Sequence, residues 1–206
     1  MAPALEVVFI KPTEAYIQDP SAINPMLELV APCKGCLGIY HGIKIEQPDI
    51  LVLLIVWDKL SDHHEVMADT VNYPKVGEAF ARVGDLSTLD MFHVHLDCDL
   101  AGVLNARVVS YGNIRKLKPG VDPAEFLKLF QILTDRETPE GCRVGGYARA
   151  VERDEFLLLY GWDDIKFSQA SREDEEVKTA MKKVHEAFEQ ADRGHVQLIT
   201  YKKYEP

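Results

Sequence analysis

The residues best suited to chemistry lie in the segment His93-Val94-His95-Leu96-Asp97. Side chains alternate along a strand, so His93, His95 and Asp97 would share one face. An imidazole takes and returns a proton near neutral pH, and a second imidazole or a carboxylate can orient it. We therefore predict acid–base catalysis by His93 and His95. Two alternatives remain: the three side chains would also suit iron, manganese or zinc, or the histidines are buried packing residues.

Tyr40 and His41 form a second candidate group, on a strand expected over residues 37–45. His41 lies on an otherwise apolar face and therefore needs a hydrogen-bond partner or a ligand. Tyr40 stands between Gly38 and Gly42, which leave space beside the strand for a ligand or a closely packed helix. We interpret both residues as substrate-binding candidates, and a structural hydrogen bond of His41 stays open as the alternative.

An internal repeat shows how the chain positions these side chains. Two apolar segments each end in Trp-Asp, at Trp57-Asp58 and Trp162-Asp163. A Gly-Cys pair precedes each tryptophan, and a His-Val pair, at His93 or His195, begins the last strand of each half. The period of about 105 residues is far longer than a solenoid repeat, so the repeated unit is a small domain.

Each half has the element order βαββαβ, which is typical of the ferredoxin-like fold. We therefore predict an α+β chain with two tandem ferredoxin-like units, residues 1–100 and 105–206. The first unit should end in a strand over residues 91–98. In the second, a helix should extend to Ala191, and the strand 196–204 should close the sheet. The segment 50–57 is apolar on both faces and needs cover on both. We expect the two four-stranded sheets to pack face to face as an intrachain α+β barrel.

The segment after the first repeated tryptophan resembles a known family. Trp57, His63, Met67 and Tyr73 have the spacing of the signature of antibiotic biosynthesis monooxygenase (ABM) domains, in the dimeric α+β barrel superfamily. Residues 91–96 resemble the fourth strand of fungal tandem-repeat members. The resemblance covers most of residues 3–98 and is weaker in the second half, which lacks the histidine and methionine.

The resemblance implies a barrel of two paired units and adds Trp57, His63 and Tyr73 to the substrate-binding candidates. Trp57 would border the cavity, although its recurrence as Trp162 also fits a structural anchor. The family does not imply one reaction. Its members include cofactor-free monooxygenases that form quinones, polyketide cyclases, haem-degrading enzymes and stress proteins.

Composition narrows the classes of partner. The net charge of −10 argues against nucleic acid and anionic membranes, which need a basic surface. Apolar runs stay short of the roughly 20 residues of a membrane span, and no basic region precedes the first one. Four cysteines do not make a disulfide framework, so we expect a cytoplasmic protein. The absence of phosphate-binding glycine motifs gives no support for a nucleotide cofactor.

These observations predict an enzyme with an apolar pocket in its first unit, acting on an aromatic, polyketide or terpenoid-like small molecule. Proton transfer without a cofactor would make it a cyclase, an isomerase or a cofactor-free monooxygenase of secondary metabolism. One alternative is a metal-dependent oxygenase or hydrolase using His93, His95 and Asp97. Another is a non-catalytic stress-response or ligand-binding barrel. The chain would be a monomer or a homodimer.

Overall fold

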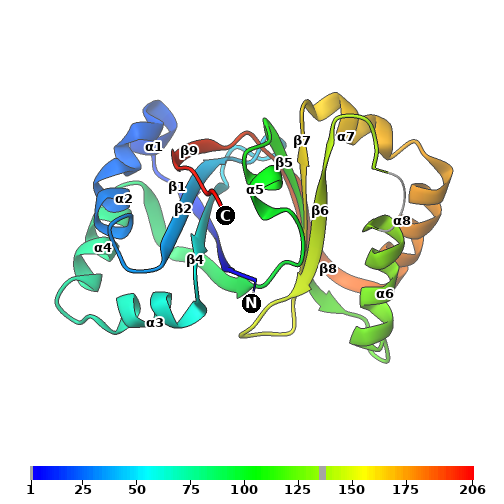
Figure 1. The fold of residues 1–206 in the computed structure, drawn as a ribbon, viewed down its shortest axis with the longest axis horizontal. Helices are drawn as coiled ribbons and strands as arrows, with labels where there is room; N and C mark the ends of the chain where they lie inside the picture. The colour runs from blue at the N-terminus through cyan, green and yellow to red at the C-terminus, as the bar shows by residue number, and fades with distance from the viewer. Residues whose placement is uncertain (1, 135–137) are drawn as a thin grey trace. The chain divides into compact units, whose positions relative to one another are not determined.

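The computed structural model describes residues 2–134 and 138–206, which form two compact units. The first unit comprises Met1–His95 and Val196–Pro206, and the second comprises Leu96–His195. Each contains an antiparallel sheet and helices (Figure 1), so the predicted α+β class with two ferredoxin-like units is confirmed. The sheet-to-sheet packing of the units stays a prediction.

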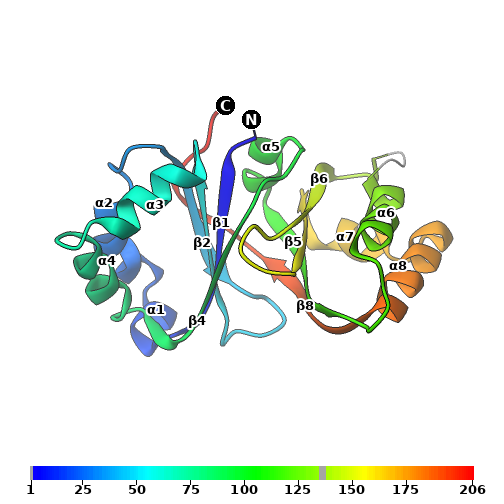
Figure 2. The same ribbon diagram turned by 90° about the horizontal axis from the view of Figure 1, so that it is seen from below.

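The first unit contains a five-stranded sheet in the order β4-β1-β3-β2-β9. Its helices α1 to α4 lie on one face of this sheet (Figure 2). The elements are β1 (Ala4–Pro12), α1 (Glu14–Gln18), the 3-10 helix η1 (Pro20–Ile23), α2 (Asn24–Val30), β2 (Cys36–Ile43), β3 (Leu51–Trp57), α3 (Leu60–Ala68), α4 (Tyr73–Phe80), β4 (Gly84–Val94) and β9 (Ile199–Lys202). Without β9, the strand order is that of the ferredoxin-like fold.

The second unit contains a four-stranded sheet in the order β6-β7-β5-β8, with α6, α7 and α8 on one face (Figure 1). The elements are α5 (Leu100–Leu104), β5 (Val108–Leu117), α6 (Pro123–Thr134), β6 (Cys142–Arg149), β7 (Phe156–Trp162), α7 (Ile165–Ser171), α8 (Glu175–Ala187) and β8 (Phe188–Val196). Since β5, β6, β7 and β8 correspond to β1, β2, β3 and β4, the second sheet has the topology of the first without β9.

The C-terminal part of the chain differs from our expectation. Helix α8 ends at Ala187, and Phe188 begins β8, which closes the second sheet. Phe188 and Ala191 pack on the core of the second unit from this strand, so their spacing did not distinguish a helix from a strand. The last strand, β9, pairs with β2, and the expected unit 105–206 therefore loses its final residues to the first unit.

Two left-handed glycines explain why the Gly-Cys and Trp-Asp pairs recur together. Gly35 has φ +79° and Gly141 has φ +65°, a region that favours glycine. Each turns the chain into β2 or β6, and its carbonyl accepts a hydrogen bond from the N–H of Asp58 or Asp163, at 2.7 and 2.8 Å. This contact fixes the end of each tryptophan-bearing strand, from which α3 and α7 then depart.

Strand β3 is buried along its whole length, as its uninterrupted apolar sequence predicts. The side chains on one face of β3 pack against Tyr16, Leu27 and Phe80 of the helices.

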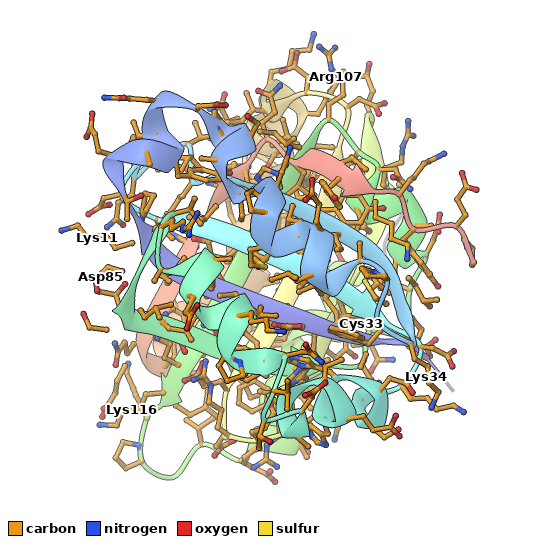
Figure 3. All side chains as sticks on the ribbon, turned by 90° about the vertical axis from the view of Figure 1, so that its left-hand side faces the viewer. Lys11, Cys33, Lys34, Asp85, Arg107 and Lys116 are labelled. Carbon is orange, nitrogen blue, oxygen red and sulfur yellow. The ribbon has the colours of Figure 1, made fainter. Side chains whose placement is uncertain are left out.

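Strand β4, at the edge of the sheet, carries charged residues: exposed Asp85 lies opposite exposed Lys11 of β1 (Figure 3). Charges on an edge strand oppose pairing with another chain. Among the described residues, no helix is long and apolar enough to cross a membrane.

Candidate functional site

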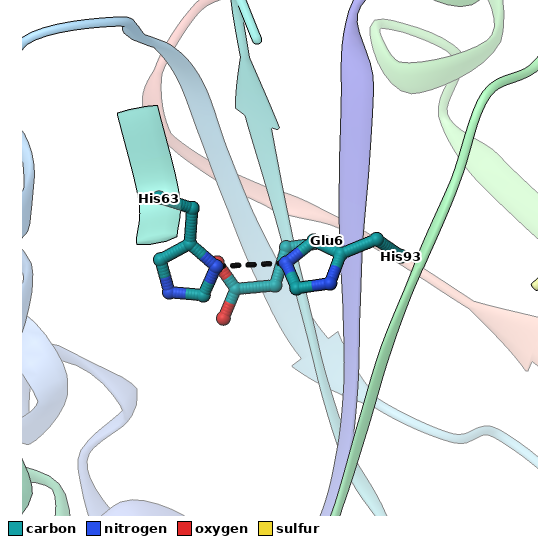
Figure 4. Close-up of side chains that lie close together, drawn as sticks. All are labelled: Glu6, His63 and His93. Carbon is teal, nitrogen blue, oxygen red and sulfur yellow. Dashed lines mark hydrogen bonds and ion pairs between the residues drawn. The ribbon is translucent and has the colours of Figure 1, made fainter. Parts of the chain in front are cut away.

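A carboxylate and two imidazoles meet inside the first unit, at Glu6 of β1, His63 of α3 and His93 of β4. Figure 4 shows the three side chains pointing toward one another. His63 Nδ1 lies 2.7 Å from His93 Nε2 and 3.5 Å from Glu6 Oε2. The exposed fractions of the three residues are 5%, 4% and 2%. Buried polar groups of this kind need partners, and here they partner one another.

Local structure explains how the three residues meet. Glu6 and His93 are cross-strand neighbours in the register of β1 and β4. His63 lies in the first turn of α3, which begins three residues after Trp57 ends β3. The turn fixed by Gly35 therefore brings the start of α3 back over the sheet and places His63 above this neighbouring pair.

Trp57 holds the cluster in position. Its indole N–H donates a hydrogen bond of 2.8 Å to Glu6 Oε2, and its ring stacks on the His63 imidazole with 4.8 Å between ring centroids. Burial raises the pKa of Glu6 to about 7, against the opposing effect of the Trp57 hydrogen bond. The Glu6 carboxyl can therefore bind or release a proton near neutral pH. Tyr73 is half-buried, and burial and the negative charge of Glu6 raise its pKa.

The structure does not bring His93, His95 and Asp97 together, which corrects the shared face expected for them. Strand β4 ends at Val94, so the alternation of side chains does not continue through the segment. His93 is buried, whereas His95 and Asp97 are exposed. His95 Nδ1 instead lies 3.2 Å from the backbone carbonyl oxygens of Ala2 and Pro3.

Tyr40 and His41 have structural partners. The Tyr40 hydroxyl accepts a hydrogen bond from the N–H of Tyr204 at 2.6 Å, which fastens the C-terminal segment to β2. His41 Nδ1 lies 2.6 Å from the hydroxyl of Tyr16. Burial lowers the pKa of His41 to about 4, so this imidazole is neutral at physiological pH. The structural hydrogen bond is therefore present at His41, and substrate binding by these residues stays a prediction.

A cavity of about 590 Å³ lies in the second unit, whereas we expected the candidate pocket in the first. Residues of β5, β7, β8, α7 and α8 contribute to its wall. The lining is largely apolar and aromatic and includes Leu158, Tyr160, Trp162 and Met181. Such a volume and lining are typical of sites for small organic molecules.

A hydroxyl–imidazole pair adjoins this cavity. Ser168, which lines it, has its Oγ 2.8 Å from Nε2 of the buried His195. The guanidinium of Arg172, also in the lining, approaches the same nitrogen at 3.4 Å. A guanidinium only donates hydrogen bonds, so Nε2 of His195 is the acceptor and the serine hydroxyl donates to it as well. His195 Nε2 is therefore arranged to receive a proton from Ser168.

The cluster and the pair occupy equivalent positions of the repeat. Trp162 donates a 2.8 Å hydrogen bond to Ser110, as Trp57 does to Glu6, and both acceptors lie at the same register from their tryptophan. Ser168 corresponds to His63 by its distance from the tryptophan, and His195 corresponds to His93 as the penultimate residue of the strand that closes the unit. The two side chains are in contact in both units. One structural frame thus holds an acid and two imidazoles in the first unit, and two hydroxyls and one imidazole in the second.

No protein-family model matches the chain, and no curated protein matches it. Solved structures match over nearly its whole length. A proposed monooxygenase from Fusobacterium nucleatum has a TM-score of 0.71 at 13% identity and covers 98% of both chains. An anthrone oxidase-like protein has a TM-score of 0.72 at 12% identity, over 97% of this chain and 92% of its own.

A Listeria monocytogenes ferredoxin-fold protein related to antibiotic biosynthesis monooxygenases is a third neighbour. It has a TM-score of 0.51 at 14% identity, over 99% of this chain and 97% of its own. At these identities the comparisons establish a shared fold, which agrees with the fold that the ABM resemblance implied.

Proposed function

We propose that the chain is an enzyme that oxygenates an aromatic or polyketide-like small molecule by proton transfer, without a bound cofactor. The observation that carries the proposal is the cavity of about 590 Å³ with the Ser168–His195 pair at its wall. The acid–base role that the sequence suggested for His93 and His95 is thereby transferred to His195, the counterpart of His93 in the repeat. The substrate-binding role falls to the aromatic lining around Trp162 and Tyr160.

The reaction begins at an acidic C–H group of the substrate. Ser168 Oγ accepts this proton while it passes its own proton to His195 Nε2, and the substrate becomes a carbanion. The Arg172 guanidinium lines the cavity and would stabilise negative charge delocalised onto a substrate oxygen. The carbanion reacts directly with O₂ to give a peroxide anion, which takes back the proton held on His195 through Ser168. Loss of water from this hydroperoxide converts the original CH₂ group to a carbonyl and leaves His195 neutral again. One O₂ is consumed, and no nucleotide is needed.

The names of the structural neighbours support this proposal at the level of reaction class, since they include monooxygenases and an anthrone oxidase-like protein. The same proton transfer without O₂ would make a cyclase or an isomerase. In a cytoplasmic setting the partner would be this small molecule alone, with the chain as a monomer or a homodimer.

The test uses anthrone, a tricyclic ketone with an acidic CH₂ group, as the probe. We expect the purified protein to convert anthrone to anthraquinone with one equivalent of O₂ consumed. Because the serine relays the proton, His195→Gln and Ser168→Ala should each lower kcat by about 10²-fold or more. Anthraquinone formation is followed by its absorbance and O₂ by an electrode.

His185 provides the matched control, because it lines the cavity and its Nε2 accepts a hydrogen bond from Arg193 rather than from Ser168. His185→Gln should keep kcat within about threefold, a change of less than about 1 kcal/mol. A loss confined to His185→Gln would assign the base to that residue. Product without O₂ consumption would favour a cyclase or an isomerase, and anthrone neither bound nor converted would contradict an aromatic substrate.

A further inference from the structure

We propose that Glu6, His63 and His93 form a binding site for a divalent transition-metal ion, zinc or iron(II), inside the first unit. This metal site is separate from the cavity of the second unit. Whether the metal site binds an ion is therefore independent of the proposed function. The metal site also differs from the set of His93, His95 and Asp97 that the sequence offered as an alternative to acid–base catalysis, of which it keeps His93 alone.

The geometry of the donor atoms supports the metal site. One ligand atom from each of the three residues lies within 4.8 Å of the other two. With bonds of about 2.0 to 2.2 Å, ligands in a tetrahedral or octahedral site lie about 3 to 3.6 Å apart. The 3.5 Å between His63 Nδ1 and Glu6 Oε2 already falls in this range. The 2.7 Å between the imidazole nitrogens would need to widen by a few tenths of an ångström.

The types of the three ligand groups indicate which class of metal ion the site would bind. Two imidazoles and one carboxylate suit zinc and non-haem iron(II), whereas magnesium and calcium prefer oxygen ligands alone. The three groups belong to three different elements, so their convergence requires the folded protein. A cation would also neutralise a carboxylate buried in the protein, which is costly to ionise without compensation.

Trp57 supplies the outer contacts that metal ligands need. Its N–H donates to Glu6 and its ring stacks on His63, so one side chain orients two of the three ligands. Groups that orient the ligands of a metal contribute about 10- to 100-fold to its affinity. Trp57 is itself fully buried, and its contacts are therefore fixed by packing.

The second unit offers an internal comparison. Its frame retains the tryptophan and one histidine, but Ser110 and Ser168 stand where Glu6 and His63 lie. Neutral hydroxyls are weak ligands for these ions, so this half should not bind a metal with comparable affinity. The first unit thus offers three metal ligands, whereas the second offers a single imidazole.

Calorimetric titration of the intact, metal-stripped protein with Zn²⁺ tests the proposal. We expect one equivalent to bind, and Glu6→Gln and His93→Gln each to weaken binding by at least about 100-fold. Glu6→Gln keeps the shape of the side chain and an oxygen for the Trp57 hydrogen bond, and circular dichroism checks its fold. Co²⁺ gives a second readout, since imidazole coordination produces a visible absorption band that both variants should lose.

Three control variants separate this site from other donors. His95→Gln removes the exposed neighbour of His93, His195→Gln removes the counterpart in the second unit, and Cys33→Ser removes the more accessible thiol of the Cys33/Cys36 pair. Each should bind Zn²⁺ with unchanged stoichiometry and affinity. The proposal is overturned if wild-type protein binds no stoichiometric Zn²⁺. It is also overturned if folded Glu6→Gln and His93→Gln bind as wild type does, or if a control variant abolishes the site.

Discussion

Glu6 is a carboxyl group in a strand whose neighbouring residues are apolar, and its protonation is linked to stability. Burial raises its pKa in the folded state from 4.5 to about 7. Between these values the unfolded chain is ionised while folded Glu6 retains its proton. The stabilisation by the protonated form is therefore complete below pH 4.5 and is lost as the pH rises through about 7. The loss corresponds to about 3 kcal/mol.

We predict that Glu6→Gln removes this pH dependence. Relative to wild type, the free energy of unfolding of the variant should increase by about 3 kcal/mol between pH 4.5 and pH 8. Urea denaturation at a series of pH values, with a chelator present, measures it. Glu28→Gln changes an exposed carboxyl and should follow the wild-type curve. If the free energies of unfolding of Glu6→Gln and wild type changed in parallel with pH, this result would contradict the raised pKa of Glu6.

The Tyr16–His41 hydrogen bond leads to a second prediction. Tyr16→Phe keeps the ring in the core but leaves the buried His41 Nδ1 without the hydroxyl. An unsatisfied buried polar group costs about 1 to 3 kcal/mol, so unfolding by urea should occur at a correspondingly lower concentration. Anthrone turnover should not change, because His41 is structural in this interpretation. A selective loss of turnover with unchanged stability would restore His41 as a substrate-binding residue.

At the scale of residues, the sequence singled out Trp57, His63 and His93, which the structure brings into contact, and their functional roles stay predictions. It did not predict Glu6, although a single acid within the apolar run Leu5–Ile10 was a usable signal. His95 and Asp97 were wrongly placed beside His93 because the end of a strand is poorly defined by sequence. The cavity of the second unit was not foreseen, since its wall is assembled from residues of several separate elements that meet only in the fold.

At the scale of elements, β9 completes the edge of the first sheet next to β2. Gly38 permits the approach: a Cβ there would lie 2.7 Å from Tyr204 Cβ and 3.1 Å from the Tyr204 backbone. Lys202 Nζ adds hydrogen bonds to the carbonyl oxygens of Ala31 and Cys36, at 3.0 and 2.6 Å. The sequence showed an extended C-terminal segment, but the edge it pairs with is a property of the tertiary structure.

We predict that Gly38→Ala destabilises the protein by about 1 to 3 kcal/mol, because the added methyl group overpacks this contact. Gly77→Ala is the matched control. A Cβ on Gly77 meets nothing within 4 Å, and alanine in the α4 helix should stabilise by about 0.5 to 1 kcal/mol. Urea denaturation gives both values, and hydrogen exchange at Ile39 and His41 reports β9 directly. Unchanged exchange in Gly38→Ala would argue against the close packing of this strand.

At the scale of the whole molecule, the second unit is continuous in sequence, and the first is assembled from two separated parts of the chain. The link between the second unit and β9 is the short segment Gln197–Leu198, which lies between β8 and β9. A protease site inserted there would separate β9 from the rest of the chain. Once this covalent link is cut, the effective concentration of β9 beside the β2 edge of the first sheet falls.

We therefore expect cleavage at this inserted site to increase amide exchange in β2 and to leave exchange in β5 unchanged. Hydrogen-exchange mass spectrometry after proteolysis measures both strands. A control site in the exposed turn at Val151–Glu152, between β6 and β7, should leave β2 protected after cleavage. Equal loss of protection in β2 and β5 after cleavage at the first site would indicate that the units do not respond separately.

The return of β9 to the first sheet also orders events during translation. The ribosome makes Met1–His95 before Leu96–His195, yet the strand that covers the β2 edge emerges only after both segments have been synthesised. Domains of a nascent polypeptide usually fold from the N-terminus onward. Here the later unit has its complete set of strands before the earlier one does. Until β9 arrives, the β2 edge of the nascent chain presents unpaired N–H and C=O groups, with which a strand of another chain could pair.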